Sequence, residues 1–421
     1  MSFFRIYIYL KLKFFFLSIF NKVSSPEEKI KSLLNQYTKK KNSILTGQLR
    51  VGFFLVIKYL KKKYPQKKEI IVSSYNLAEM INICKNLNLK VKFTKLNENI
   101  FLDADDLKKK INQKTLAVLV TNIFNTSKNI KSIKSVCKKF NVPLIEDNAI
   151  YFGNYTYIKG KKVFSGSYGD YSLHSFNIMK NISGMYGGSV SSDDEKFINY
   201  SKNELTKFQK FPFIKYSIQC VIYFILKIIS LKYFYKLFFF NFLKRAYKKK
   251  NKYILKLIYP SLKFKKQKFE SNFLTKLNNL SSQMIWYQLN DKNNIALNHI
   301  IRKNNNIYYD KLFKKFNIKE LRTIKMKEPN YQNFNDFPII VEDKAKLILY
   351  LLNNGIETKT IQYLDCHKIF EKNTKGLDNY ENRVLCLPNH IKIKKSYIDY
   401  IVSKIYYFYK YKSKNKINMS M

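Results

Sequence analysis

The strongest constraint on the fold is an alternation of helical and extended stretches between residues 49 and 192. Apolar residues recur with helical spacing over residues 49–63, 77–86, 107–114 and 130–140. Short apolar runs typical of strands separate them, over residues 69–73, 91–96, 116–121 and 143–146. Such alternation predicts an α/β fold, with a mainly parallel sheet covered by helices on both faces.

Polar residues follow three of these predicted strands. Ser74, Asn122 and Asp147 come directly after or at the ends of the strands at 69–73, 116–121 and 143–146. In parallel sheets, ligands bind at the carboxyl ends of the strands. The three positions therefore predict one ligand site at that edge of the sheet.

A spaced set of residues over 143–188 carries recognisable chemistry. Ile-Glu-Asp147 ends one strand, and a second strand at 171–176 is followed by Lys180-Asn-Ile and then Gly187-Gly188. This order suits an enzyme that holds pyridoxal phosphate (PLP). The lysine amine can bond to the cofactor's aldehyde, and the aspartate can keep the pyridine nitrogen protonated. The stretch resembles the lysine region of the sugar aminotransferases of the DegT–StrS family.

The resemblance implies a role for each residue of the set. Lys180 would be the catalytic lysine, Asp147 the partner of the pyridine nitrogen, and Ser175 a ligand of the cofactor phosphate. Each has an ordinary alternative: a solvated surface lysine, a helix N-cap and a plain strand serine. Asn122 would lie beside the cofactor.

The other half of a phosphate site is expected at the start of the first long helix, near Thr46-Gly47-Gln48. Free amides and the helix dipole favour an anion there. The family usually has glycine directly before the residue that matches Arg50, where this chain has Leu49. Gly47 would then act in a shifted turn, so Thr46 and Gly47 are predicted cofactor ligands.

Three further positions depart from the family pattern. Ile150 stands where glutamine or histidine usually reaches the cofactor's hydroxyl. Leu77 stands where an aromatic residue stacks on the ring, which leaves Tyr75 as a possible substitute. Lys359 replaces an arginine, so a bidentate clamp becomes a point charge. None of these changes touches Lys180 or Asp147.

Charge alone does not identify a partner. The chain has 78 Lys and Arg against 29 Asp and Glu, a net charge of +49. Lys, Asn, Ile, Phe and Tyr, which have A/T-rich codons, are abundant together, so base composition accounts for much of the excess. The basic residues are spread along the chain and no nucleic-acid motif accompanies them, so nucleic-acid binding is not expected.

Cysteine and histidine spacing predicts neither disulfides nor a metal site. The five cysteines are odd in number and have no C-x-x-C spacing, which favours free thiols in a reducing compartment. The four histidines lie far apart along the chain. His367 matches a family histidine near the substrate. His174, His367 and Asp170 stay open between a site and a structural role.

The C-terminal part, residues 295–410, predicts a smaller α/β lobe. A strand at 337–341 precedes a helix at 344–353, and Gly355 is the expected C-cap. These segments also resemble the family. The predicted division is an apolar N-terminal segment (1–24), a large PLP-binding domain (25–294), the small domain (295–410) and a tail (411–421).

Two apolar segments lie outside the resemblance. Residues 213–231 approach the length of a membrane span, but Lys215, Gln219, Lys227 and Ser230 fall on one side of a helical wheel. A single crossing would separate Lys180 from the small domain, and residues 211–243 are too few for two crossings. The prediction is a helical pair lying in one leaflet over 211–250, with its basic end on an anionic cytoplasmic surface. A helix pair buried at a dimer interface is the alternative.

The second apolar segment is residues 1–20. It lacks the small-residue cleavage motif of a signal peptide, so an interfacial helix or an uncleaved anchor is expected.

The resemblance implies a PLP-dependent aminotransferase. It would pass an amino group from an amino acid, usually glutamate, to a nucleotide- or lipid-linked keto-sugar in surface polysaccharide synthesis. Family members complete their active sites as homodimers. With the apolar segments, this predicts a cytoplasmic enzyme on the inner face of the cell membrane. The alternatives are a sugar dehydratase of the same fold, which carries histidine in place of the lysine, a PLP lyase or ligase-like enzyme, and a silent membrane scaffold.

Overall fold

The computed structural model describes residues 7–124, 130–150, 152–249, 271–324, 336–359, 363–371 and 379–414, together with residues 251, 253 and 377. Residues 1–6 of the predicted N-terminal segment, residue 250 of the insertion and residues 415–421 of the tail lie outside this set.

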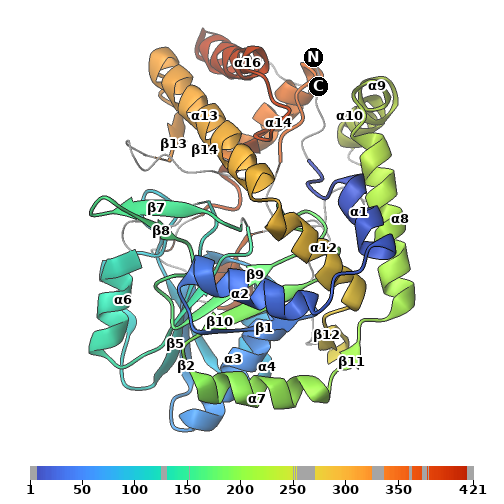
Figure 1. Cartoon of the computed structure of the whole chain (residues 1–421). Coiled ribbons are helices and arrows are strands. Elements are labelled where there is room, and N and C mark those ends of the chain that lie inside the picture. The colour runs from blue at the N-terminus through green and yellow to red at the C-terminus, as the bar shows by residue number, and fades with distance from the viewer. Residues whose placement is uncertain are drawn as a thin grey trace.

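A seven-stranded sheet forms the centre of the molecule, in the order β1-β10-β9-β6-β5-β2-β4 (Figure 1). The strands are β1 (Asn42–Thr46), β2 (Glu69–Ser73), β4 (Lys90–Thr94), β5 (Thr115–Thr121), β6 (Leu144–Asp147), β9 (Tyr171–Ser175) and β10 (Gly188–Ser192). From β9 to β4 all neighbours are parallel, whereas β1 and β10 pair antiparallel. The predicted, mainly parallel α/β fold is confirmed.

Helices cover both faces of this sheet, as the alternation predicts. They are α3 (Leu49–Lys63), α4 (Ala78–Asn86), α5 (Ala104–Lys110), α6 (Ile130–Lys139) and α7 (Glu195–Thr206). Successive strand residues point to opposite faces. Ile70 and Val72 of β2 therefore join the core with α3 and α4, while Ile71 joins the core with α5 and α6. Each predicted helix and strand is present, with ends shifted by a few residues.

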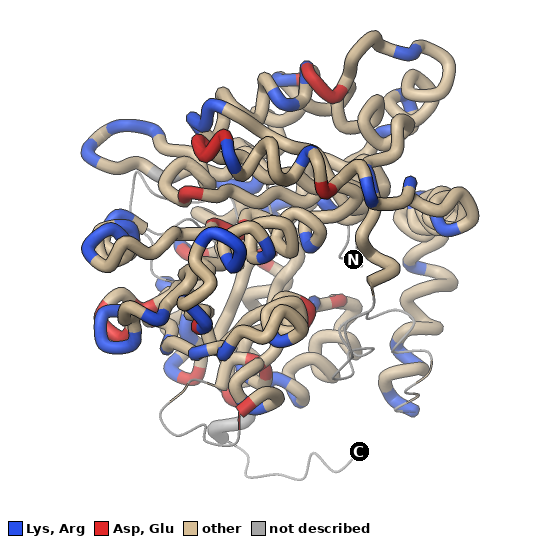
Figure 2. Tube along the Cα trace, turned by 90° about the horizontal axis from the view of Figure 1, so that it is seen from below, with Lys and Arg blue, Asp and Glu red and all other residues tan. Residues whose placement is uncertain are grey.

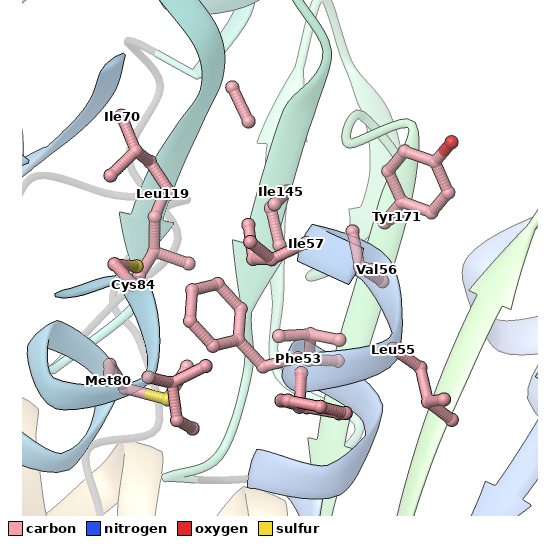
Figure 3. Packing of buried hydrophobic residues seen from close by; sticks show 14 of the residues in the cluster. Phe53, Leu55, Val56, Ile57, Ile70, Met80, Cys84, Leu119, Ile145 and Tyr171 are labelled. Atoms are coloured by element: carbon pink, nitrogen blue, oxygen red, sulfur yellow. The ribbon is translucent and has the colours of Figure 1, made fainter. Parts of the chain in front are cut away.

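Helix α3 is apolar almost all round because it is enclosed between the sheet and other helices. Phe53, Leu55, Val56 and Ile57 are wholly buried and pack over the sheet (Figure 3). Its first turn thereby has a fixed position at the sheet edge. The helix begins at Leu49, and Thr46 is the last residue of β1, so the expected start near Thr46 is corrected.

A second, smaller sheet lies in the C-terminal part. Strands β13 (Leu321–Thr323), β14 (Phe337–Val341) and β16 (Val384–Leu387) pair antiparallel. The helices packed around them are α13 (Lys292–Phe316), α14 (Lys344–Asn353) and α16 (Lys395–Lys414). Gly355 follows the C-cap Asn354 with a φ of 78°, as expected of a glycine that ends a helix.

Several short elements flank or link the two sheets. They are α2 (Pro26–Thr38), β3 (Tyr75–Asn76), β7 (Tyr155–Ile158), β8 (Lys161–Phe164), β11 (Gln209–Lys210), η3 (Ser271–Phe273), β12 (Thr275–Lys276), α12 (Asn279–Asn290), β15 (Leu364–Asp365) and α15 (Cys366–Phe370). β3 pairs with β15, which ties the large sheet to the C-terminal part.

The apolar segments form helices at one side of the molecule (Figure 1). They are α1 (Leu12–Phe20), α8 (Phe213–Ile229), α9 (Lys232–Phe234), η1 (Tyr235–Phe239) and α10 (Phe240–Lys248). In the described part of the chain no single helix is long and apolar enough to cross a membrane. The stretches Phe213–Ile229 and Lys232–Lys248 meet those criteria only together, with a bend of 78° between them.

One buried hydrogen bond joins these helices to the small domain. Tyr235 Oη of η1 donates to Glu357 Oε2 at 2.6 Å, and both residues are fully buried. Phe240 and Leu243 of α10 pack beside them against Leu352. The helices after α8 thus form a small apolar cluster with α14, beside the main core of the C-terminal part.

Candidate active site

The ends of β5 and β6 bring two predicted site residues together. Thr121 pairs with Asp147 in the sheet, and the Asn122 N–H donates to the Asp147 carbonyl at 2.9 Å. Asn122 Nδ2 also donates to Asn148 Oδ1 at 2.6 Å, while its own Oδ1 is buried with no partner in the described ranges of the chain. Asn122 therefore lies beside Asp147, with one acceptor left over.

Two adjacent acids at the end of β6 point to opposite faces and meet different surroundings. Glu146 accepts three backbone N–H groups from the turn at 166–169, so its carboxylate is satisfied within the protein. Asp147 Oδ1 accepts only the Ala149 N–H, at 2.9 Å. Its Oδ2 is buried and has no partner in the described residues. Glu146 is a structural acid, whereas Asp147 has an oxygen free for a donor.

Burial controls the charge of Asp147. It raises the pKa of this carboxyl to about 6, although the Ala149 N–H and the nearby Lys180 both lower it. A buried, unpartnered carboxylate oxygen is costly and marks a site for a ligand donor. The protonated pyridine nitrogen of PLP would supply such a donor, so this position fits the cofactor.

The loop that carries Lys180, residues 176–187, is held at two points. Asn181 accepts the Phe152 N–H at 2.9 Å and donates to the Phe152 carbonyl at 2.8 Å. Gln288 of α12 makes the same pair of bonds with the Ser183 backbone, at 3.1 and 2.6 Å. Paired contacts of this kind restrict the loop and with it the position of Lys180.

Lys180 itself is half-buried, and its Nζ has no hydrogen bond or ion pair among the described residues. Burial lowers its pKa to about 8, and the positive charge of Lys359 adds to the effect, while Asp147 opposes it. Lys359 is itself paired with Asp336 at 2.7 Å. The Lys180 amine is therefore partly neutral near pH 7 and able to act as a nucleophile.

Three neighbouring strands line up Ser175 with the start of α3. Ser175 is opposite Gly188, and Gly188 is opposite Thr46. A Cβ on Gly188 would lie 2.3 Å from the Leu49 nitrogen, so only glycine lets the first turn of α3 come this close. Ser175 thus lies at the edge where the positive end of α3 favours an anion.

Thr46 and Gly47 have other partners in the structure. The Thr46 hydroxyl donates to the Gln48 carbonyl at 2.8 Å, and the Gly47 N–H donates to the Thr275 carbonyl at 2.9 Å. A Cβ on Gly47 would lie 2.2 Å from Thr275 Oγ1, so glycine is required there by β12. With both donors engaged, the first turn of α3 and Ser175 are the better placed phosphate ligands.

Tyr75 does not present a ring face to the site. Its ring is fully buried between those of Tyr363 and Tyr380, each 5.9 Å away, and its backbone pairs with Asp365. This packing disfavours Tyr75 as the aromatic residue that stacks on the cofactor. Leu77, the N-cap of α4, is half-buried against both main cores.

Tyr363 is a site candidate that motif reasoning did not single out. Burial and then the charge of Asp147 raise the pKa of its phenol, which places Tyr363 within electrostatic reach of Asp147. Its hydroxyl is buried without a partner in the described part of the chain. The only sequence signal was its place in the C-terminal segment that resembles the family.

Asp170, His174 and His367, which the sequence left open between a site role and a structural role, have different surroundings in the structure. Asp170 lies before β9, at the opposite end from Ser175, and binds Lys134 Nζ at 2.6 Å and the Leu144 N–H at 2.8 Å. It is structural. His174 is buried on β9, where its ring contacts Phe152, and burial lowers its pKa to about 3. His367, in the first turn of α15, is buried with its Nδ1 3.5 Å from the Ser74 carbonyl. Ile150, one of the departures from the family pattern, packs against the core of the C-terminal part.

Known proteins share this fold and parts of this sequence. The model of the DegT/DnrJ/EryC1/StrS aminotransferase family matches residues 22–209 and 248–406. A GDP-perosamine synthase of Vibrio cholerae is 33% identical over 135 residues, which is 32% of this chain and 36% of that protein. The match thus spans about a third of that relative's length.

Solved structures agree along nearly the whole chain. The Helicobacter pylori aminotransferase PseC, involved in the biosynthesis of pseudoaminic acid, has a TM-score of 0.72 at 15% identity and covers 98% of this chain and 100% of its own. The PLP form of a putative sugar aminotransferase from Streptococcus pneumoniae has a TM-score of 0.70 at 14% identity, covering 98% and 99%. By fold and by family match, the chain belongs to the DegT/DnrJ/EryC1/StrS aminotransferase family.

Proposed function

We propose that this protein is a PLP-dependent aminotransferase that acts on a nucleotide- or lipid-linked keto-sugar. The observation that carries the proposal is the pair formed by Asp147 and Lys180. One is a buried carboxylate with an unpartnered oxygen, and the other is an amine whose pKa is lowered to about 8 beside it. A merely structural pair would form a salt bridge, and none joins these two residues.

Each residue of the pair has a separate task. When bound, PLP supplies the electron sink that allows an amino group to pass between two carbonyl carbons. Asp147 Oδ2 would accept a hydrogen bond from the ring nitrogen and keep its proton in place. Lys180 would hold the cofactor through its amine and move protons at the reacting carbon.

The substrate class is supported by the relatives. The Vibrio cholerae relative is named for a GDP-linked sugar product, and PseC for the biosynthesis of pseudoaminic acid. A sugar acceptor is accordingly proposed here, with glutamate or another amino acid as donor and surface polysaccharide synthesis as the pathway. The proposal also includes a homodimer, and a cytoplasmic location on the inner face of the cell membrane.

A direct assay tests the activity. The purified protein with added PLP should show the visible absorbance of bound cofactor, and glutamate should discharge it. Addition of a nucleotide-linked 4-keto-sugar should restore that absorbance and yield an amino-sugar. A protein that binds no PLP, or binds it and transfers nothing from any common amino acid to keto-sugars, would refute the proposal.

A further inference from the structure

The family model leaves two apolar segments unmatched, residues 1–21 and 210–247, and their described residues, 7–21 and 210–247, meet in space. Phe15 of α1 stacks on Tyr223 of α8 with ring centroids 5.6 Å apart. Tyr223 Oη donates to the Leu10 carbonyl at 3.1 Å, and Lys227 Nζ donates to the Ile8 carbonyl at 3.0 Å. Two additions far apart in sequence therefore build one unit, here called the apolar surface: α1, α8, α9, η1 and α10.

Helix α8 presents its polar side to the protein. Gln219 accepts a hydrogen bond from Tyr186 at 3.3 Å, and Lys227 is bound to Ile8 as described. Tyr216 and Tyr223 are buried on the same side. Gln219 and Lys227 of the polar stripe thus face the protein, whereas Lys215 at the start of the helix is exposed. Polar residues that face inward are the reverse of an ordinary surface helix in water.

The outer side of α8 is apolar, and no described residue covers it. Phe213 is 80% exposed, Ile214 74% and Val221 58%. Ile218, Ile225 and Ile228 are exposed on the same helix. Exposed apolar area of this extent on a soluble protein indicates a binding partner.

The rest of the apolar surface continues this pattern. Phe16 and Phe20 of α1 are exposed, the latter by 81%. Leu237 and Phe238 of η1, and Leu231 before α9, are exposed as well. The uncovered area therefore extends across three helices instead of ending with α8.

Charge distinguishes between possible partners. Residues 1–26 and 205–269 contain no aspartate or glutamate, although the whole chain has 29 of them. Lys232, Lys236, Arg245, Lys248 and Lys249 are exposed around the apolar residues. Figure 2 shows the insertion, at the right of the view, with basic and no acidic positions. A second copy docked through the same face would bring two basic rims together, which is repulsive. An anionic lipid leaflet complements both the charge and the apolar residues.

We propose that the apolar surface docks on an anionic lipid leaflet, with the outer side of α8 at the acyl boundary and the basic residues of α9–α10 among the headgroups. This deepens the membrane location proposed above by naming the surface and the lipid chemistry. Vesicle binding is measured without substrate or cofactor. A failure here is therefore distinguishable from a failure of the proposed aminotransferase activity.

The test is flotation of the full chain with vesicles of phosphatidylcholine alone or mixed with phosphatidylglycerol. The protein should float with the mixed vesicles and much less with the neutral ones. The variant Ile218→Asp/Ile222→Asp/Ile225→Asp should stay at the bottom of the gradient. A matched control, Ile300→Asp/Tyr407→Asp/Tyr411→Asp, changes exposed apolar residues on α13 and α16 and should float like the parent.

A second variant guards against misfolding of the first. Arg245→Gln/Lys248→Gln/Lys249→Gln leaves the apolar residues intact and should weaken partition into anionic vesicles about a hundredfold. Equal flotation of all variants, or no flotation of the parent, overturns the proposal. So does a parent dimer that ignores vesicles and dissociates when aspartates enter α8, because a second copy then covers the surface.

Discussion

The candidate active site and the apolar surface break opposite rules of protein structure. Around Asp147, polar atoms of Asp147, Asn122 and Tyr363 are buried without partners among the residues that the structure describes. On α8, large apolar side chains such as Phe213 and Ile214 are exposed to water. Both arrangements cost free energy in the isolated chain.

The contrast indicates which partner suits each region. The unpartnered polar atoms of the candidate active site suit a small polar ligand with hydrogen-bond donors, and the exposed side chains of the apolar surface suit the lipid leaflet proposed above. Elsewhere the same residue types are satisfied: Glu146 has three backbone donors, and Ile70 and Val72 are enclosed. At these residues buried polar groups are paired and large apolar side chains are enclosed, so the exceptions point to sites of function.

Lys180→Ala should have the largest effect. Without the amine, neither cofactor attachment nor proton movement is possible, so amino transfer should fall by about 10⁵-fold or more. The fold should remain, and vesicle flotation should be unchanged, which separates the two regions. Turnover at the parental rate in a coupled amino-transfer assay would remove Lys180 from catalysis.

Asp147→Asn should come next. An amide cannot hold the ring nitrogen protonated, so turnover should fall roughly a thousandfold while PLP stays bound. Without cofactor the variant should be at least as stable as the parent, because it loses a carboxylate whose pKa burial raises to about 6. Glu146→Gln is the control and should destabilise, since it weakens three bonds to the turn at 166–169. A destabilised Asp147→Asn with normal turnover would show a structural aspartate.

Asn181→Ala should loosen the Lys180 loop. It removes two bonds to the Phe152 backbone, each contributing about 1 kcal/mol, so the free energy of unfolding should fall by about 2 kcal/mol. Asn181→Asp keeps the acceptor and loses the donor, and should lie between the two in urea titration. An unchanged midpoint for both variants would show that the loop is held elsewhere.

Ser175→Ala should weaken PLP binding by about tenfold, the loss of one hydrogen bond to a charged phosphate. The dissociation constant can be measured by absorbance titration. Thr46→Val serves as the comparison, because the Thr46 hydroxyl already donates to Gln48 and should matter less for PLP. The reverse order of effects would restore Thr46 as the phosphate ligand.

The smallest predicted effect is on pH dependence. With a Lys180 pKa of about 8, the neutral amine rises from about a tenth of the population at pH 7 to about half at pH 8. The rate of PLP capture should rise about fivefold over that interval and level off above it. Lys359→Gln removes a nearby positive charge, raises the pKa of Lys180, and should move the profile to higher pH. Profiles that coincide would exclude Lys359 as a neighbour of the amine.

Local patterns predicted much of the fold and the central pair of the site. Strand and helix periods are properties of short segments, so the βαβ region could be recognised directly. Strands β1 and β10 could not, because they have little apolar alternation and are defined by pairing, β1 with β10 and β10 with β9. Pairing with β10 places Thr46 in a strand, and contact with β12 lets the Gly47 N–H donate to the Thr275 carbonyl. Both contacts join residues far apart in the sequence.

The sequence also could not predict which side of a helix faces the protein. The helical wheel located the polar side of α8 correctly, but it contains no information on which way that side points. Only tertiary contacts, with Tyr186 and with Ile8, show that Gln219 and Lys227 of this side face the protein. Likewise, Tyr75 and Tyr363 are both tyrosines beside family motifs, and only packing separates an enclosed ring from one near Asp147.

The buried hydrogen bond between Tyr235 and Glu357 limits how this protein could be engineered. Excising residues 211–247 to obtain a detergent-free catalytic core would take the Tyr235 donor from Glu357, two positions before Lys359, and would uncover Leu352. The inserted helices therefore contribute buried contacts to the C-terminal part. A variant without the proposed lipid contact should therefore keep every helix and replace only the exposed residues on the outer side of α8.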